Sequence, residues 1–446
     1  MRKKMRNRGV LYRLFFNRAD ERAYGRFAFF FDGRMQSFSG IFANGVFYTA
    51  FLRLNNISMS DVGIMTYMPI FANLSCIFSP FIFRNMKKRK PILMAARMVY
   101  YFTTLVGVAL VPMIFSASAL RLALMCTMLS LGNVIWGLFI GGFADWELHF
   151  LPQDGTREEY YAYRNLIGSL TGVVTNLIAG VVASAIELLP EAEQLSWLFW
   201  LRIGGFIFIL IDVLVFLRVK EYEYPKSGNV PNLKNVFTMS LKNKRFCRAI
   251  FTRDFMTLVN AITSSSLTYY LLDCGLGYGT QSFLAAIPPI LSLLLTKPAV
   301  MLFRRMGCVK NLLLYHVVDA VGLIAYVMIT PASVQWLYPA VYVVTQIVAV
   351  GKGIADTDFV FRFMPEEDRL NYHSFYYITH SFSAFIGAFI GAQYITLTEG
   401  RDFVILGMPF ANVQLLMLAK AALFIIGIFL LASFRKELSK EEEIAA

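Results

Sequence analysis

The sequence predicts an all-α integral membrane protein, with twelve transmembrane helices arranged as two parallel six-helix repeats. Three observations predict this class: the composition, a series of long apolar runs, and polar loops that recur at a nearly constant spacing. Of the 446 residues, 57% are hydrophobic and only 16% are charged, whereas about a quarter of the residues in a soluble protein are charged. The apolar runs are about 20 residues long, which is the length needed to cross a bilayer.

The helices are expected in twelve apolar runs along the chain. These runs are 35–55, 61–83, 92–115, 119–145, 163–187, 194–217, 249–272, 279–303, 311–330, 334–357, 373–397 and 411–434. An even number of helices after a basic N-terminus places both termini in the cytoplasm. In that topology 33 of the 42 Lys and Arg residues lie on the cytoplasmic side, and only Arg53, Arg121 and Arg401 lie outside. This imbalance follows the positive-inside rule.

The predicted domain organisation follows from the position of the longest polar connection. That connection contains Pro225, Gly228 and Pro231 as helix breakers. We therefore predict a basic cytoplasmic N-terminal arm, an N-terminal half, a cytoplasmic linker, a C-terminal half and a cytoplasmic tail, at 1–34, 35–217, 218–248, 249–434 and 435–446.

Two pairs of loops indicate that the halves are duplicates. The polar island at 145–165 contains an acid, aromatic residues, Pro152 and an acidic cluster followed by Arg, and 358–373 repeats this order around Pro365. The two Pro residues are 213 positions apart. A second pair of basic loops begins at Pro80 and Pro298, which are 218 apart. Loops that repeat in order at nearly one offset favour a parallel duplication, and chance similarity of basic loops is the alternative.

The loop after the second run carries a family motif. Its sequence is Ser79-Pro80-Phe81-Ile82-Phe83-Arg84-Asn85-Met86-Lys87-Lys88. It is similar to G-x-x-x-D-R-x-G-R-R, with Arg84, Lys87 and Lys88 at basic positions and Phe83 in place of the acid. With its six plus six helices and central linker, the chain resembles the major facilitator superfamily (MFS) of transporters over essentially its whole length. The resemblance implies that helices 3, 6, 9 and 12 are peripheral and that the other eight line a central cavity.

Candidate substrate-binding residues are amides and aromatic rings near the middle of the expected cavity helices. Six runs carry one carboxamide in their central third, whereas runs 3, 6, 9 and 12 carry none there. The candidates are Asn44, Tyr48, Asn73, Asn133, Trp136, Asn176, Asn260, Tyr269, Gln346 and Tyr376. Rings beside amides suit an uncharged hydroxylated solute. The alternatives are hydrogen bonds that join helices, worth about 0.6 to 2 kcal/mol each, and ordinary packing of the rings.

Charged residues inside the runs require partners, because an unpaired charge at mid-membrane costs about 2.5 to 3.5 kcal/mol. Lys352 and Asp356 share a helix face at a spacing of four, as do His316 and Asp319 at a spacing of three. Arg202, Asp212 and Lys420 need partners on other helices. We assign Arg253, Lys352 and Asp356 as candidate coupling residues, with static ion pairs as the alternative.

The polar island and its copy, together with Arg84 of the basic loop after the second run, are the candidate cytoplasmic gate. The gate residues are Arg84, Asp145, Arg157, Arg164, Asp358 and Arg369. We expect Asp145 or Arg164 to pair with Asp358 or Arg369 across the two halves.

Several classes of function are not indicated by the sequence. The five Cys residues form no CxxC pair, so neither a disulfide framework nor a metal site is expected. No phosphate-binding loop or catalytic motif is present, so we expect no cofactor and no enzyme activity. The net charge of +13 follows the topology and favours contact with anionic lipids rather than nucleic acid.

The predicted function is secondary active transport of a small solute by alternating access, in a monomer of the cell membrane. A neutral polar solute such as a sugar or glycoside suits the residues best, with a proton or sodium ion as the candidate coupling ion. The alternatives are efflux of amphipathic drug-like compounds, a membrane sensor that transports nothing, and a membrane enzyme.

Overall fold

The structure is a computed structural model of the chain. It describes residues 12–17, 20–83, 86–151, 157–223, 233–365, 369–401, 403–405 and 407–434. The described residues are helical apart from their connections and one antiparallel hairpin, in which Phe403 pairs with Phe410. This agrees with the all-α class predicted from the composition.

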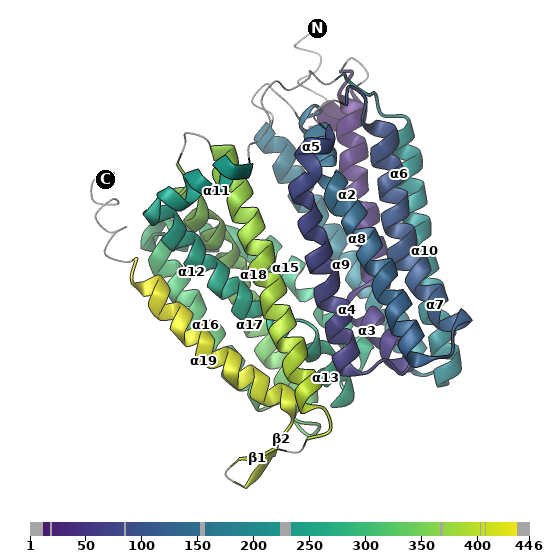
Figure 1. Cartoon of the computed structure of the whole chain (residues 1–446), viewed down its shortest axis with the longest axis vertical. Coiled ribbons are helices and arrows are strands. Elements are labelled where there is room, and N and C mark those ends of the chain that lie inside the picture. The colour runs from purple at the N-terminus through teal and green to yellow at the C-terminus, as the bar shows by residue number, and fades with distance from the viewer. Residues whose placement is uncertain are drawn as a thin grey trace. The chain divides into compact units, whose positions relative to one another are not determined.

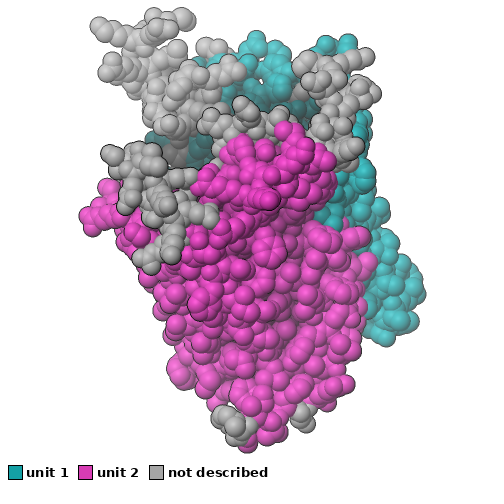
Figure 2. Space-filling view, turned by 60° about the vertical axis from the view of Figure 1, so that its left-hand side comes forward, with its two compact units in different colours: residues 1–55, 72–230 teal, residues 56–71, 231–446 magenta. Residues whose placement is uncertain are grey.

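The chain divides into two compact units, which Figure 2 shows in different colours. Unit 1 contains residues 1–55 and 72–230, and unit 2 contains residues 56–71 and 231–446. The units divide the chain at 230/231, inside the predicted linker at 218–248. The outer part of the second helix, residues 56–71, packs with unit 2, which a division by chain order does not anticipate. The boundaries of the five predicted segments remain a prediction.

In unit 1 long helices run side by side (Figure 1). Its elements are η1 (Tyr12–Phe16), α2 (Ala23–Ala43), α3 (Gly45–Leu54), η2 (Asn73–Phe78), α5 (Ser79–Phe83), α6 (Lys90–Tyr101), η3 (Phe102–Gly107), α7 (Val108–Ile114), α8 (Ser118–Leu148), α9 (Arg157–Glu187) and α10 (Glu191–Leu217). The short segment η3 is a π-helix that widens the third membrane helix between α6 and α7.

Unit 2 has the same kind of architecture, and the hairpin lies at the end opposite to α11 (Figure 1). Its elements are α4 (Met59–Ala72), α11 (Leu233–Lys242), α12 (Lys244–Ala261), α13 (Ser266–Asp273), α14 (Tyr278–Leu284), α15 (Ile287–Met306), α16 (Cys308–Val327), α17 (Val334–Arg362), α18 (Arg369–Thr398), β1 (Phe403–Ile405), β2 (Met408–Phe410) and α19 (Asn412–Ala432). The predicted linker therefore contains a helix, α11, and the first residues of α12.

The first long helix of each half is interrupted. The break in the first half lies at Asn44, where the backbone is extended, and Gly45 follows with a φ of 57°. The break in the second half lies between α12 and α13, at 262–265. Positions 44 and 262 are 218 apart, which is the offset of Pro80 and Pro298. The equal offset supports a duplication, although the two-repeat arrangement itself remains a prediction.

Ten helices among the described residues are long and apolar enough to span a membrane. The two predicted runs without such a helix are 35–55 and 249–272. These coincide with the interrupted helices, and α2 and α12 also carry charged residues such as Asp32 and Arg253. The first helix also begins at Ala23, inside the predicted basic arm. The count of twelve therefore stays a prediction.

The outer surfaces of the long helices are apolar. Val181, Leu214, Leu294 and Phe429 are each more than 60% exposed, and they lie on candidate membrane spans. Exposed apolar patches of this extent do not occur on ordinary soluble proteins. The chain is therefore a multi-pass membrane protein whose helices require a lipid environment.

Each unit contains a buried aromatic cluster. In unit 1, Trp146 packs edge to face against Phe29 and Phe143. In unit 2, Phe359 packs in the same manner against Phe363 and Phe434. Trp146 and Phe359 are both 1% exposed and are 213 positions apart, which is the offset of the polar island and its copy. Trp146 and Phe359, each of which directly follows an acid in the polar island or its copy, are thus core residues.

Candidate functional site

Four membrane-embedded charged residues of unit 2 lie together on three helices. We call Arg253 (α12), Asp319 (α16), Lys352 and Asp356 (both α17) the unit 2 network. Lys352 Nζ lies 2.5 Å from Asp319 Oδ2, and Arg253 Nη2 lies 3.6 Å from Asp356 Oδ2. The four side chains are 17 to 21% exposed. Two cations and two acids therefore offset one another away from bulk water.

The pairing in the unit 2 network differs from the pairing that the sequence suggested. Lys352 and Asp356 do share a face of α17, but each has its ion-pair partner on another helix. His316 does not pair with Asp319; its Nδ1 donates to Leu312 O at 2.8 Å, and its ring stacks on Phe424. The spacing along one helix could not reveal this, because contacts between helices decide which charge each side chain meets.

A chain of polar contacts continues from the unit 2 network to α18. Arg253 Nη1 donates to Thr257 Oγ1 at 3.2 Å, and this hydroxyl lies 3.1 Å from His380 Nδ1. The same histidine nitrogen lies 3.8 Å from Asp254 Oδ1. Arg253 and Asp254, which are adjacent in sequence, therefore reach different partners that are joined through Thr257 and His380. This chain of polar contacts links α17, α12 and α18.

Lys420 of α19 lies at the interruption of the seventh membrane helix. Its Nζ donates to Thr263 Oγ1 at 2.9 Å and to Asn260 O at 3.3 Å. A break in a helix frees backbone carbonyls that require donors, and the ammonium group supplies them. The prediction that Lys420 has its partners on another helix is confirmed.

Unit 1 holds a second buried charged group, which we call the unit 1 triad: Asp32 (α2), Arg97 (α6) and Asp212 (α10). Arg97 Nη2 forms an ion pair with Asp32 Oδ1 and lies 2.7 Å from Asp212 Oδ2. The side chains of Arg97 and Asp212 are fully buried, and Asp32 is 9% exposed. The expected partner of Asp212 on another helix is therefore Arg97.

Asp32 was not among the residues predicted from the sequence. It falls in the predicted cytoplasmic arm at 1–34, whereas α2 begins at Ala23 and carries Asp32 into the helix bundle. A helical run of apolar residues from Ala23 to Phe31 was the available signal, because Phe27, Phe29, Phe30 and Phe31 continue the apolar pattern upstream of Asp32.

Arg202 of α10 also finds its partners on another helix. Its Nη2 donates to Thr104 O at 2.6 Å, and its guanidinium lies 4.8 Å from the centre of the Tyr48 ring. Thr104 is part of the π-helix η3, where the widened turn leaves backbone carbonyls available. The prediction of an interhelical partner for Arg202 is confirmed, and the candidate substrate residue Tyr48 lies beneath this cation.

The predicted substrate residues of unit 1 lie mostly against their own helices. Asn133 donates to Leu129 O at 2.8 Å, and Asn176 donates to Gly172 O at 2.7 Å. Trp136 stacks on Tyr100 with the ring centres 5.2 Å apart. Asn73 begins η2, and Asn44 is exposed at the break of the first helix. In Asn133 and Asn176 the amide nitrogen is thus already bonded to the backbone of the same helix.

The predicted substrate residues of unit 2 are more accessible. The Asn260 side chain is exposed, and Gln346 and Tyr376 are half-buried. Tyr376 packs beside His380, with the ring centres 5.4 Å apart. The Tyr269 hydroxyl donates to Ile57 O at 3.2 Å. Tyr376 therefore adjoins the polar chain described above, whereas Tyr269 bonds Ile57, just before the second membrane helix.

The candidate gate residues have partners within their own units. Asp145 Oδ2 lies 2.5 Å from Arg89 Nη1, and Arg164 pairs with Glu147. In unit 2, Asp358 pairs with Arg362, four residues along α17. Arg84 and the side chains of Arg157 and Arg369 lie outside the described residues. Pairing between the halves stays a prediction.

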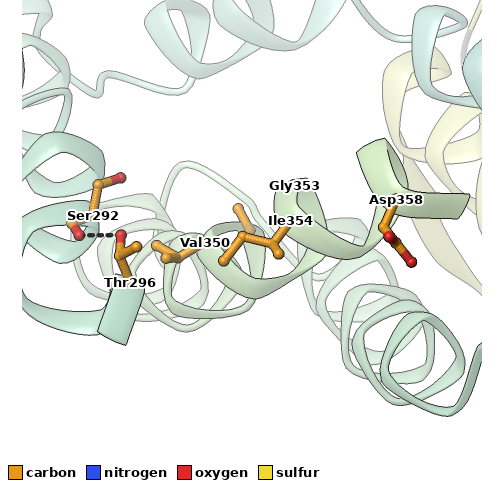
Figure 3. A pocket seen from close by; sticks show the side chains of 7 residues that line it. Ser292, Thr296, Val350, Gly353, Ile354 and Asp358 are labelled. Atoms are coloured by element: carbon orange, nitrogen blue, oxygen red, sulfur yellow. Dashed lines mark hydrogen bonds between the residues drawn. The ribbon is translucent and has the colours of Figure 1, made fainter. Parts of the chain in front are cut away.

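A cavity of about 700 Å³ opens between α15 and α17 of unit 2 (Figure 3). Ser292 and Thr296 line it from α15, and Val350, Ile354 and Asp358 line it along α17. None of the ten predicted substrate residues is among its lining residues. Asp358, a predicted gate residue, places one carboxylate at this cavity.

The helices described above have the fold of the major facilitator superfamily, a class of membrane transporters. A mutant of the nucleoside transporter NupG matches with a TM-score of 0.66 at 11% identity, over 93% of this chain and 99% of that one. A POT family transporter in complex with 5-aminolevulinic acid matches with a TM-score of 0.67 at 12% identity, over 93% and 96%.

A D-xylose-proton symporter also matches, with a TM-score of 0.62 at 10% identity, over 92% of this chain and 96% of that one. No family model and no curated protein matches the sequence. At such low identity the likeness shows the fold alone. The resemblance drawn from the basic loop and the helix count is therefore confirmed at the level of the fold, and the matching structures named here are transporters rather than enzymes.

Proposed function

We propose that the protein is a secondary transporter that moves a small solute across the cell membrane by alternating access. The observation that carries this proposal is the unit 2 network, in which Arg253, Lys352 and their acids lie inside helices of a transporter fold. Charges within a membrane are costly and usually mark a pathway for a solute or ion. The multi-pass architecture and the fold are the broader support.

The proposed substrate is a neutral polar solute such as a sugar or glycoside. The charges of the unit 2 network offset one another, so a solute that met them would need no net charge. The accessible amide of Asn260 and the ring of Tyr376 beside His380 supply hydrogen bonds and a stacking surface of the kind that carbohydrates use. Asn44, Tyr48, Asn73, Asn133, Trp136, Asn176, Tyr269 and Gln346 complete the proposed set.

The proposed coupling residues are Arg253, Lys352 and Asp356. The Arg253 and Asp356 pair is looser than the Lys352 and Asp319 pair, at 3.6 Å against 2.5 Å. A loose pair can open at low cost, and its polar chain to Thr257 and His380 offers the arginine an alternative partner. Binding of a proton or sodium ion by the released Asp356 would then be linked to movement of α17.

The proposed cytoplasmic gate involves Asp145, Arg164, Asp358 and Arg369, together with Arg84 and Arg157. In one state these residues keep partners in their own units, as Asp145 and Arg89 do; in the other state they would exchange them for partners across the halves. The termini lie in the cytoplasm, the basic loops contact anionic lipids, and the protein acts as a monomer.

Uptake into proteoliposomes tests the proposal. A panel of neutral sugars and amphipathic dyes is offered with and without proton and sodium gradients. Accumulation of a sugar that depends on a gradient is the expected result. Dye movement without sugar uptake would favour efflux of amphipathic compounds, and absence of movement of any solute in the panel would overturn the proposal in favour of a sensor.

The site assignment is tested with Asn260→Leu and Asn133→Leu. Both variants should lose uptake while the purified protein keeps its elution profile and melting temperature. Leu120→Ala, a change at an exposed apolar position, is the control and should transport normally. Normal uptake by both Asn variants would remove these amides from the proposed site.

A further inference from the structure

The unit 1 triad carries more negative than positive charge. Asp32, Arg97 and Asp212 come from α2, α6 and α10, which lie side by side in unit 1 (Figure 1). Both carboxyl groups converge on one nitrogen, Arg97 Nη2. With both acids ionised, the three buried side chains hold one uncompensated negative charge. An ionised carboxylate is very costly to bury without full compensation.

The two acids of the triad are not equivalent. Asp32 accepts hydrogen bonds from Arg97 Nη2 and, at 2.8 Å, from Gln36 Nε2. Asp212 is fully buried, and among the described residues its polar neighbours are Arg97, whose Nη2 lies 2.7 Å from Asp212 Oδ2, and the Asp32 carboxyl group. Asp212 therefore shares a single guanidinium group with Asp32.

The other charged groups around the triad act on Asp32, whereas the charged groups that act on Asp212 are Arg97 and Asp32. Arg34 of α2 and Arg164 of α9 both attract the Asp32 carboxylate electrostatically. Arg164 also forms an ion pair with Glu147 of α8. Glu147 adds a negative charge. The ring of Tyr101, on α6, lies with its centre 5.5 Å from the guanidinium carbon of Arg97. The rings of Phe143 and Phe216 cover the guanidinium of Arg97, and the Asp212 side chain is fully buried.

We propose that the unit 1 triad is a proton-binding site and that Asp212 carries the proton. A neutral carboxyl group at Asp212 removes the excess charge and leaves Arg97 paired with Asp32. A metal cation fits the site poorly, because the guanidinium of Arg97 occupies the position between the carboxylates. Release of the proton would require Arg97 to move toward Asp212 or water to enter between α2, α6 and α10.

Proton binding here follows from the triad alone, whereas its use as the coupling ion rests on the proposed transport function. If the protein transports a solute, protonation of Asp212 in one state and its release in another would couple solute movement to the proton gradient. This site would act from unit 1, and accumulation driven by a proton gradient would require it together with the unit 2 network.

Infrared spectroscopy of the purified protein in detergent tests the binding of the proton. The wild-type protein at neutral pH should show the carbonyl band of a protonated carboxyl group, and Asp212→Asn should lose it. Asp319→Asn is the control, because Asp319 has a cationic partner of its own in Lys352, and it should keep the band. A band that persists in Asp212→Asn, or that disappears equally in Asp319→Asn, would overturn the proposal.

A second variant leaves Asp212 in place and guards against misfolding of Asp212→Asn. In Asp32→Asn, Arg97 has a single acid to neutralise, so Asp212 should ionise and the same band should disappear. A band unchanged in Asp32→Asn would show that the charge imbalance does not hold the proton, and would also overturn the proposal.

Transport assays test the coupling role separately. Asp212→Asn should retain exchange of solute across the membrane but lose accumulation driven by a proton gradient. The coupling role would be overturned if the wild-type protein accumulated solute with a sodium gradient alone. It would also be overturned if Asp212→Asn retained accumulation driven by a proton gradient. If the wild-type protein moves no solute, the transport proposal fails, and the infrared result still decides whether the triad binds a proton.

Discussion

Lys352 Nζ lies 2.5 Å from Asp319 Oδ2, so the lysine of α17 pairs with the acid of α16 and not with Asp356 on its own helix. The ammonium group also lies 5.4 Å from the centre of the Phe424 ring of α19. The lysine thereby joins three helices of unit 2. Such a pair stabilises the unit only while both partners are present, because each charge is mostly withdrawn from water.

The first prediction concerns the stability of this pair. Lys352→Leu should lower the free energy of unfolding by about 3 kcal/mol, because it leaves Asp319 buried without its cation. The double variant Lys352→Leu with Asp319→Leu should recover most of this loss. Melting temperatures of the wild-type, single and double variants measure the coupling. Additive losses would show that the two side chains do not stabilise each other.

The second prediction separates coupling from binding at Asp356. Asp356→Asn should lower accumulation driven by an ion gradient by about 5- to 150-fold, the range that corresponds to a coupling free energy of about 1 to 3 kcal/mol. Exchange of solute at equal concentrations should continue. Glu193→Gln, at an exposed position at the start of α10, is the control. Equal accumulation by Asp356→Asn and wild type would exclude Asp356 from coupling.

The fold was predictable from the sequence because the bilayer imposes simple requirements on it. Apolar runs of about 20 residues and the placement of basic residues were sufficient for a multi-pass helical protein. The need for interhelical partners was also predictable at Arg202, Asp212 and Lys420, since an isolated charge is costly in a membrane. What the sequence could not supply is which partner each would take.

The interrupted helices explain why parts of the site were missed. Asn44 appeared in the sequence as a mid-membrane amide, but the structure places it at a helix break that no Pro marks. Arg202 and Lys420 bind backbone carbonyls at η3 and at the break after α12. Carbonyl acceptors are present at every residue, so a sequence pattern does not show which ones a local distortion makes available.

The third prediction concerns Arg202 and the π-helix η3. Arg202→Leu should destabilise the protein by about 1 to 3 kcal/mol, because it leaves the Thr104 carbonyl buried without a donor. Arg202→Lys should retain part of the stability, because an ammonium group can still donate one hydrogen bond. Thermal unfolding in detergent measures both. A Leu variant that unfolds at the wild-type temperature would mean that water or another donor satisfies the carbonyl.

The fourth prediction concerns the contact between α18 and α12. A Cβ atom added at Gly391 would collide with Ile262 O, and one added at Gly387 would collide with Leu258 O. These atoms belong to the backbone and cannot move aside as a side chain can. Gly391→Ala should therefore cost about 1 to 3 kcal/mol through overpacking. At Gly204 of α10 nothing lies within 4 Å of an added Cβ, so Gly204→Ala should keep or raise the melting temperature.

Comparison of the two Gly variants isolates the steric effect, since both make the same chemical change inside a helix. The Gly391→Ala variant should also slow any movement of α18 against α12, and so lower the transport rate more than its remaining folded fraction explains. Equal melting temperatures for Gly391→Ala and Gly204→Ala would contradict the close approach of α18 to the break after α12.

Lys420 of α19 binds Thr263 at the same break. Lys420→Met should therefore lower the melting temperature by itself, because the freed carbonyl of Asn260 loses a donor.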